Sequence, residues 1–242
     1  PKRLNHFNSE KKRMKCTTFD TNAALAEQVV SELSALKPHS RVLIPSGSTP
    51  HWIYEALAAT PFAERLTFFA LDEWVNVPSE SDGSCLNMIN QDFVHKCAYP
   101  VRLVHFNPFA STAQNIAHYQ TALNGEEFDY VILGVGMNGH IGLNEPGVPF
   151  DEDYLQTQLD DVTINVASHK YFSGDVTLTE GITVGLNKII KAGKVIVIIN
   201  HDAKKDIYQE IVNGDAHHTQ VPAIYIKQFP QVNYYVTKNL IG

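Results

Sequence analysis

Short apolar runs alternate along the chain with longer amphipathic stretches. The apolar runs are four to eight residues long and predict buried strands at 41–45, 66–71, 101–106, 128–134, 162–167, 194–200 and 232–237. The amphipathic stretches have apolar residues at helical spacing and predict helices at 21–37, 49–59, 84–97, 111–124, 180–192 and 202–212. We expect Thr49 to cap the second of these helices, with Pro50 at its first position.

This alternation indicates one fold class. Strands that are apolar throughout and separated by helices favour parallel pairing with both faces covered. We therefore predict an α/β fold: a single doubly wound, mostly parallel sheet with helices on both faces, in a modified Rossmann-like arrangement. Residues 1–242 form one domain in this interpretation, with 1–17 a poorly specified N-terminal segment. Ligands of such sheets bind at the carboxyl ends of the strands.

Composition narrows the function classes. The formal net charge of −7 over 242 residues leaves no basic surplus for a nucleic-acid backbone. The three cysteines, Cys16, Cys85 and Cys97, are widely spaced, which favours free thiols in a reducing compartment over a disulfide framework or a zinc site. No run of 18 apolar residues predicts a membrane span, and the basic start lacks the apolar core of a secretory signal. We expect a cytoplasmic protein that contacts neither nucleic acid nor membrane.

Residues 44–50, IPSGSTP, follow the first predicted strand and lead directly into a helix. Gly47 permits close approach of the backbone, the hydroxyls of Ser46, Ser48 and Thr49 offer hydrogen bonds, and a helix N-terminus favours an anion. The segment is thus a candidate phosphate cradle. A capped turn without any ligand is the alternative.

Residues 70–75, ALDEWV, place two carboxylates directly after the second apolar strand. Phe69, Leu71 and Trp74 surround Asp72 in the sequence and would raise its pKa toward the range of a useful general base. The alternative is an ordinary solvated turn carboxylate.

Residues 134–139 match the G-x-G-x-x-G pattern of a dinucleotide-binding loop. Such a loop runs into a helix, but Gly142, Pro146 and Gly147 make a regular helix improbable here. The stretch instead presents His140 and Glu145, with Glu145 held extended by the following proline, and this pair suits proton transfer near neutral pH. A structural histidine in a loop is the alternative.

Taken in order, the three motifs resemble the glucosamine-6-phosphate deaminase/isomerase family. The resemblance spans about residue 20 to about residue 237, and the histidine motif with Asn-Glu-Pro-Gly is its most specific part. Leu-Asp-Glu-Trp, the Asp-Gly-Ser-Cys run at 82–85 and Glu-Gly-Ile-Thr-Val-Gly-Leu look closer to the galactosamine-6-phosphate branch.

The resemblance implies a role for each matching residue. Asp72 would move a proton between C1 and C2 of the sugar, and His140, supported by Glu145, would open the ring. The motif also makes Asn138 a catalytic position. The positions implied to bind substrate, chiefly through its 6-phosphate, are Ser46, Gly47, Ser48, Thr49, Gly139, Lys170 and Lys204. No metal and no cofactor are implied, and the partner is a small sugar phosphate; a homo-oligomer is left open.

Two positions depart from the family pattern. Many relatives have aspartate where this chain has Asn138, and a neutral amide can orient an imidazole but cannot stabilise its charged form. Lys170 stands where many members have arginine, which replaces bidentate recognition with a point charge. Lys170 and Lys204 lie in less firmly matching segments, so an ordinary surface role is the alternative for both.

The implied reaction is isomerisation with deamination of a 6-phosphorylated 2-amino-2-deoxyhexose, giving the ketose 6-phosphate and ammonium. A 6-phosphogluconolactonase is the nearest alternative; it resembles the same fold, but we would expect Asp-Glu-Arg at 72–74 and no Asn-Glu-Pro-Gly after the histidine. A non-catalytic sugar-phosphate sensor is the alternative from another class. It should have a helix-turn-helix segment, which the pattern lacks, and could lose Asp72, His140 and Glu145, which this chain retains.

Overall fold

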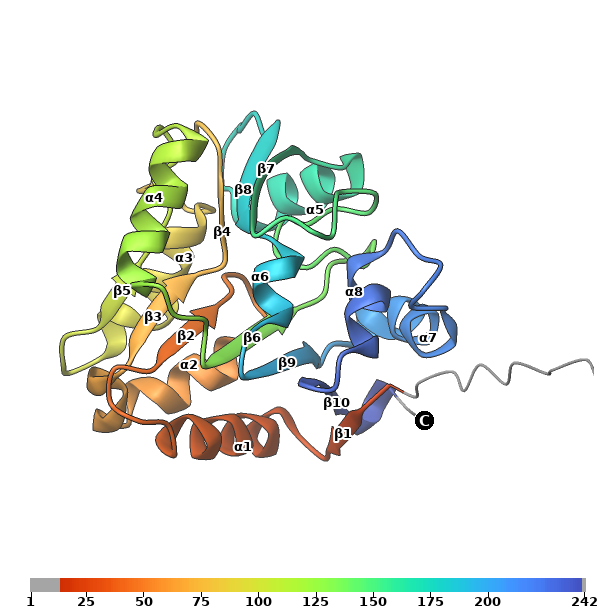
Figure 1. The fold of residues 1–242 in the computed structure, drawn as a ribbon, viewed down its shortest axis with the longest axis horizontal. Helices are drawn as coiled ribbons and strands as arrows, with labels where there is room; N and C mark the ends of the chain where they lie inside the picture. The colour runs from red at the N-terminus through yellow and green to blue at the C-terminus, as the bar shows by residue number, and fades with distance from the viewer. Residues whose placement is uncertain (1–13, 241–242) are drawn as a thin grey trace, which may run out of the picture.

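The computed structural model describes residues 14–240, and its centre is a seven-stranded sheet in which every neighbouring pair is parallel (Figure 1). In spatial order the strands are β1 (Cys16–Phe19), β10 (Val232–Thr237), β9 (Lys194–Ile199), β6 (Tyr130–Gly134), β2 (Arg41–Ile44), β3 (Thr67–Ala70) and β5 (Arg102–Val104). The apolar runs form these strands because both faces of the sheet are buried.

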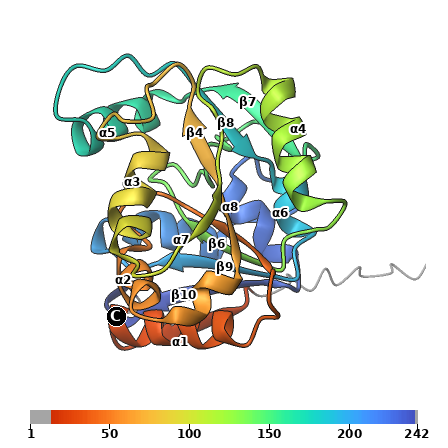
Figure 2. The same ribbon diagram turned by 90° about the vertical axis from the view of Figure 1, so that its left-hand side faces the viewer.

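Helices cover both faces of the sheet, as Figure 2 shows from the side. One face packs against α1 (Asn22–Ser34), α2 (His51–Ala58) and α3 (Cys85–Asp92). The other packs against α4 (Thr112–Leu123), α6 (Leu186–Ile190), α7 (Lys205–Asn213) and α8 (Pro222–Tyr225). The predicted α/β fold with a mostly parallel, doubly wound sheet is confirmed.

A second, antiparallel sheet of three strands lies beyond the carboxyl ends of the first. It consists of β4 (Asp72–Trp74), β8 (Glu180–Val184) and β7 (Tyr154–Gln158), and α5 (Asp161–Tyr171) packs beside it. This sheet was not predicted, because its strands are short and each pairs with a segment distant in the sequence.

The predicted strand at 162–167 is wrong, because these residues form the first turns of α5. Val162, Ile164 and Val166 alternate as in a strand, but Val162 and Val166 are exposed while Thr163 and Ala167, four residues apart, are buried. Asp160 caps the helix by accepting a hydrogen bond from the Val162 amide (2.8 Å).

The predicted helix at 180–192 is wrong in its first half, which is strand β8. Ile182, Thr183 and Val184 are β-branched and buried, and they pair with β4 on one side and β7 on the other. Gly185 then precedes the short helix α6. The predicted Thr49 cap is also wrong, because Pro50 occupies the capping position of α2.

Most other predicted elements occur within a few residues of the expected bounds. Of the N-terminal segment, residues 1–13 lie outside the described part of the chain, whereas Cys16 and Thr17 pair with β10 in strand β1. Among residues 14–240, no helix is long and apolar enough to cross a membrane.

Candidate active site

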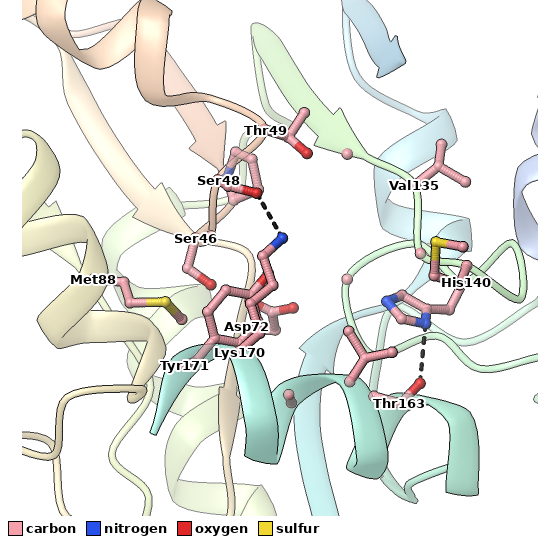
Figure 3. A pocket seen from close by; sticks show the side chains of 18 of the residues that line it. Ser46, Ser48, Thr49, Asp72, Met88, Val135, His140, Thr163, Lys170 and Tyr171 are labelled. Atoms are coloured by element: carbon pink, nitrogen blue, oxygen red, sulfur yellow. Dashed lines mark hydrogen bonds between the residues drawn. The ribbon is translucent and has the colours of Figure 1, made fainter. Parts of the chain in front are cut away.

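A cavity of about 500 Å³ lies at the carboxyl edge of the parallel sheet, between the strand ends and α5 (Figure 3). Its walls are the segments that directly follow β2, β3, β6 and β9, together with one face of α5. The strands deliver these segments to one place because parallel strands end at the same edge. Residues of all three sequence motifs therefore line one cavity.

The loop after β2 forms one end of the cavity. Ser46, Gly47, Ser48 and Thr49 all line it. Gly47 has a positive φ of 84°, and a Cβ at this position would lie 3.0 Å from the Tyr171 hydroxyl, so the loop requires glycine there. Lys170 on α5 reaches across and donates a hydrogen bond to Ser48 Oγ (2.8 Å).

Two lysines lie at the same end of the cavity. Burial lowers the pKa of Lys170. Burial, and then the nearby charge of Lys170, lowers the pKa of Lys204 to about 8. Within residues 14–240 neither lysine forms a salt bridge. Two neighbouring cations without a carboxylate partner, beside a hydroxyl-rich loop, make a site for an anion.

Asp72 lies deeper in the cavity, at the start of β4, with 9% of its surface exposed. Burial, reinforced by the adjacent charge of Glu73, raises the pKa of Asp72 to about 7. Its Oδ1 atom is buried and has no hydrogen-bond partner among the described residues. The raised pKa expected for Asp72 is confirmed, and the alternative interpretation of Asp72 as a solvated turn carboxylate is wrong.

Glu73 faces away from the cavity and stabilises α3. It is 1% exposed, and its two carboxylate oxygens accept hydrogen bonds from the amides of Trp74, Cys85 and Leu86, each at 2.9 Å. Cys85 and Leu86 begin α3, so the carboxylate also lies at the positive end of that helix. Of the two adjacent carboxylates, only Asp72 faces the cavity.

His140 lines the opposite side of the cavity, and its Nδ1 lies 3.5 Å from Glu145 Oε2. Glu145 is 4% exposed; burial alone would raise its pKa, but hydrogen bonds and the charge of His140 outweigh burial and lower it. Asn138 donates from Nδ2 to Glu145 Oε2 (3.0 Å) and accepts the His140 amide at Oδ1 (3.1 Å). Asn138 therefore orients the carboxylate and the backbone, not the imidazole.

The glycines of this loop make room for the histidine. A Cβ on Gly136 would lie 2.1 Å from the His140 ring. Gly139, with φ 81°, turns the chain; a Cβ there would lie 2.3 Å from Val221, and its carbonyl accepts the Ala223 amide. Gly139 does not line the cavity, in contrast to the other positions expected to bind substrate.

Several lining residues had no signal in the sequence. Thr163 was missed because residues 162–167 were predicted as a strand. Tyr171 lies beyond those residues and, like Asn200, belongs to no motif. Cys85 and Trp74 also line the cavity, and burial beside Asp72 raises the pKa of the Cys85 thiol well above its ordinary value.

Among residues 14–240, no group of three or more histidine, cysteine or acidic side chains could hold a metal ion. His217 and His218, the adjacent pair in a polar loop, are exposed, and His218 Nδ1 lies 3.1 Å from Asp215 Oδ2.

The fold and the position of the cavity define an α/β protein with a cavity at the carboxyl edge of its parallel sheet. A family profile described as glucosamine-6-phosphate isomerases/6-phosphogluconolactonase matches residues 17–234. The chain belongs to this family.

Individual relatives agree with the family match. A glucosamine-6-phosphate deaminase of Bacillus cereus (strain B4264) is 27% identical over 224 residues, which cover 90% of this chain and 85% of the relative. A solved monomeric glucosamine-6-phosphate deaminase has a TM-score of 0.83 at 21% identity, covering 94% of this chain and 99% of that one. A 6-phosphogluconolactonase from Thermotoga maritima has a TM-score of 0.72 at 20% identity, covering 92% and 98%. The two structures support the fold.

Proposed function

We propose that the protein converts a 6-phosphorylated 2-amino-2-deoxyhexose and water into the ketose 6-phosphate and ammonium. The observation that supports this most is the buried Asp72, whose pKa of about 7 suits a general base, in one cavity with His140, whose Nδ1 lies 3.5 Å from Glu145 Oε2. A lactonase has no need for a base that removes a proton from carbon, whereas isomerisation through an enolamine requires one.

In this proposal the 6-phosphate binds at the cationic end of the cavity. Lys170, Lys204 and the hydroxyls of Ser46, Ser48 and Thr49 supply donors to the phosphate oxygens. The ammonium of Lys170 contributes a point charge and lacks the paired donors of an arginine. The hydroxyls of Ser46, Ser48 and Thr49 therefore provide the directional part of the recognition.

The chemistry then divides between the two sides of the cavity. His140 takes the proton of the anomeric hydroxyl and returns it to the ring oxygen, which opens the ring. Asp72 removes the proton from C2 while the C1 aldehyde oxygen takes a proton from the substrate's own ammonium group, which gives an enolamine. Asp72 then delivers its proton to C1, and the enolamine becomes an iminium at C2. Water adds to this iminium, and the amine leaves as ammonium. No other reactant is needed for the atoms to balance.

The nearest competing function is lactone hydrolysis, since 6-phosphogluconolactonases match the same fold. Trp74 at the position where we expect arginine in a lactonase, and Asn-Glu-Pro-Gly at 144–147, favour the deaminase. We further propose galactosamine 6-phosphate as the preferred epimer. The sequence motifs around Trp74 and Cys85 resemble the galactosamine-6-phosphate branch of the family, and both residues line the cavity. Three free cysteines support a cytoplasmic location.

The test compares three substrates on the purified protein: galactosamine 6-phosphate, glucosamine 6-phosphate and 6-phosphogluconolactone. We expect ammonium release from at least one amino sugar phosphate and no lactone hydrolysis above the spontaneous rate. Asp72→Asn should abolish ammonium release, while exposed Lys37→Met serves as the control. Lactone hydrolysis without ammonium release would overturn the proposal in favour of the lactonase.

A further inference from the structure

Thr163 joins helix α5 to the acid/base pair. It is 4% exposed and lines the cavity. Its hydroxyl lies 3.1 Å from His140 Nδ1, closer than Glu145 at 3.5 Å, and Figure 3 shows this contact with the opposite ring nitrogen pointing into the cavity. The Glu145 carboxyl lies beside the same ring nitrogen, and Thr163 helps to lower the pKa of that carboxyl.

The available protons determine the direction of these bonds. An ionised carboxylate can only accept, so Glu145 Oε2, 3.5 Å from His140 Nδ1, favours a proton on this nitrogen. Thr163 Oγ1 then accepts the hydrogen bond of the Nδ1–H group, and its own proton is free to point toward Glu145. Nε2 is left without a proton and is the basic nitrogen that faces the cavity.

We propose that Thr163 is a positioning residue that relays His140 to Glu145 and fixes the imidazole as the Nδ1–H tautomer, with Nε2 free to accept a proton from substrate. This inference rests on the proposed function, in which His140 opens the sugar ring. It also accounts for Asn138: because the amide at 138 does not reach the imidazole, the hydroxyl from α5 supplies the contact that orients it.

The hydroxyl is not needed to build the helix. Asp160 already caps α5 through the Val162 amide. The Thr163 hydroxyl bonds outside the helix instead of to a carbonyl one turn back, which is the usual partner of a threonine within a helix. A change at Thr163 that keeps the shape should therefore leave α5 folded.

Placement on α5 also connects the histidine to the phosphate. Thr163 and Lys170 are seven residues apart, two turns of helix, and both lie on the face that lines the cavity. An anion bound to Lys170 therefore holds the helix that orients His140. Substrate without the 6-phosphate loses this support, so its kcat should fall as well as its affinity.

The test uses Thr163→Val, which keeps the shape without the hydroxyl, and Thr163→Ser, which restores the hydroxyl. Asn165→Ala is the control, since Asn165 is exposed on the same helix and does not line the cavity. The first measurement is the ¹⁵N spectrum of histidine-labelled protein with and without inorganic phosphate, which reports the tautomer of His140 and needs no turnover. The His140→Gln spectrum assigns the signal.

We expect the ligand-free protein to show the Nδ1–H tautomer, Thr163→Val to show both tautomers, and Thr163→Ser to match the original. Inorganic phosphate should sharpen the His140 signal in the original protein and not in Thr163→Val. An unchanged tautomer in Thr163→Val, or a serine variant that behaves like the valine variant, would overturn the inference.

The second measurement is turnover of the amino sugar phosphate. Thr163→Val should lower kcat by about 10- to 100-fold with a smaller change in KM. Within the His140→Gln background the same substitution should have no further effect, since it acts through the imidazole. A full additional loss there contradicts the relay. If no variant has ammonium-releasing activity but the tautomer shifts as expected, the proposed function fails and the Thr163 relay stands.

Discussion

Lys204 provides a quantitative test, because the structure holds its ammonium in an unfavourable place. Burial and the neighbouring charge of Lys170 lower its pKa from the ordinary 10.5 to about 8. A lysine whose pKa is lower in the folded than in the unfolded state destabilises the folded protein while the side chain is charged. The destabilisation is complete below about pH 8 and disappears as the pH rises toward the pKa of the unfolded state. A bound phosphate dianion would reverse this effect by pairing with the charge.

The magnitude follows from the pKa. A depression from 10.5 to about 8 corresponds to about 3 kcal/mol, which we reduce to about 1.5 kcal/mol because the side chain is partly solvated. Lys204→Met should therefore stabilise the ligand-free protein by about 1–2 kcal/mol at pH 7. The same change should raise KM by one to two orders of magnitude, a loss of about 1.4–2.8 kcal/mol of charge-assisted contact.

The pH dependence gives a second magnitude for the same group. The charged fraction of Lys204 falls about tenfold between pH 7 and pH 9, so KM should rise about tenfold over this interval. Lys204→Met should have a high KM that no longer changes over it. Lys37→Met, an exposed lysine between α1 and β2, should leave stability and KM unchanged.

Steady-state kinetics from pH 6.5 to 9 and thermal unfolding without ligand provide both readouts. The reasoning is refuted by a Lys204→Met protein that is less stable than the original, or by a KM that is unchanged. Either result would return Lys204 to the role of an ordinary surface lysine.

Three further predictions concern the base, the carboxylate and the epimer. Glu73→Gln removes the charge that helps to raise the pKa of Asp72, so the acid limb of the kcat/KM profile, expected near pH 7, should move to lower pH. The variant should also lose about 1–3 kcal/mol of unfolding free energy in denaturant, because the amide replaces the carboxylate that accepts three backbone hydrogen bonds. An acid limb that does not move contradicts its assignment to Asp72. Asn138→Asp places a second carboxylate 3.0 Å from Glu145 Oε2 and should lower kcat at pH 7 by about tenfold or more. Activity should recover in part at higher pH, where both carboxyl groups ionise. Full activity at pH 7 would show that the Asn138 amide is dispensable. Galactosamine 6-phosphate should have the higher kcat/KM of the two epimers, and a higher value for the gluco epimer reverses the preference.

The parallel sheet was predictable because its strands are apolar throughout and its helices are long enough to show their period. The elements beyond its carboxyl edge were not. The exposed Val162 and Val166 alternate with polar residues and imitate a strand, while the Asp160 cap and the burial of Thr163 make a helix. In β8, burial against β4 and β7 outweighs the helical spacing of the residues around it.

The site was predictable where a short motif follows a strand. Asp72 lies just after β3 and His140 lies in the loop after β6, and their chemistry is visible in these motifs. Thr163 could not be found this way, since its contact with His140 joins two segments 23 residues apart and depends on the packing of α5. Gly139 shows the opposite case, because its place in the motif reflects a turn against Val221 and Ala223 and not a position in the cavity.

The central claim is that Asp72 moves a proton between C1 and C2 of a sugar phosphate, and isotope exchange tests it most directly. The original protein, Asp72→Asn and His140→Gln are incubated with the amino sugar phosphate, or with its ketose product and ammonium, in deuterated water, and NMR follows label at C1 and C2. We expect exchange in the original protein, and slow exchange in His140→Gln at a rate that follows the open-chain fraction. In Asp72→Asn the rate should fall by at least about 10²–10⁴-fold, to the background level. Substantial exchange in Asp72→Asn would contradict the account and assign the base to another residue.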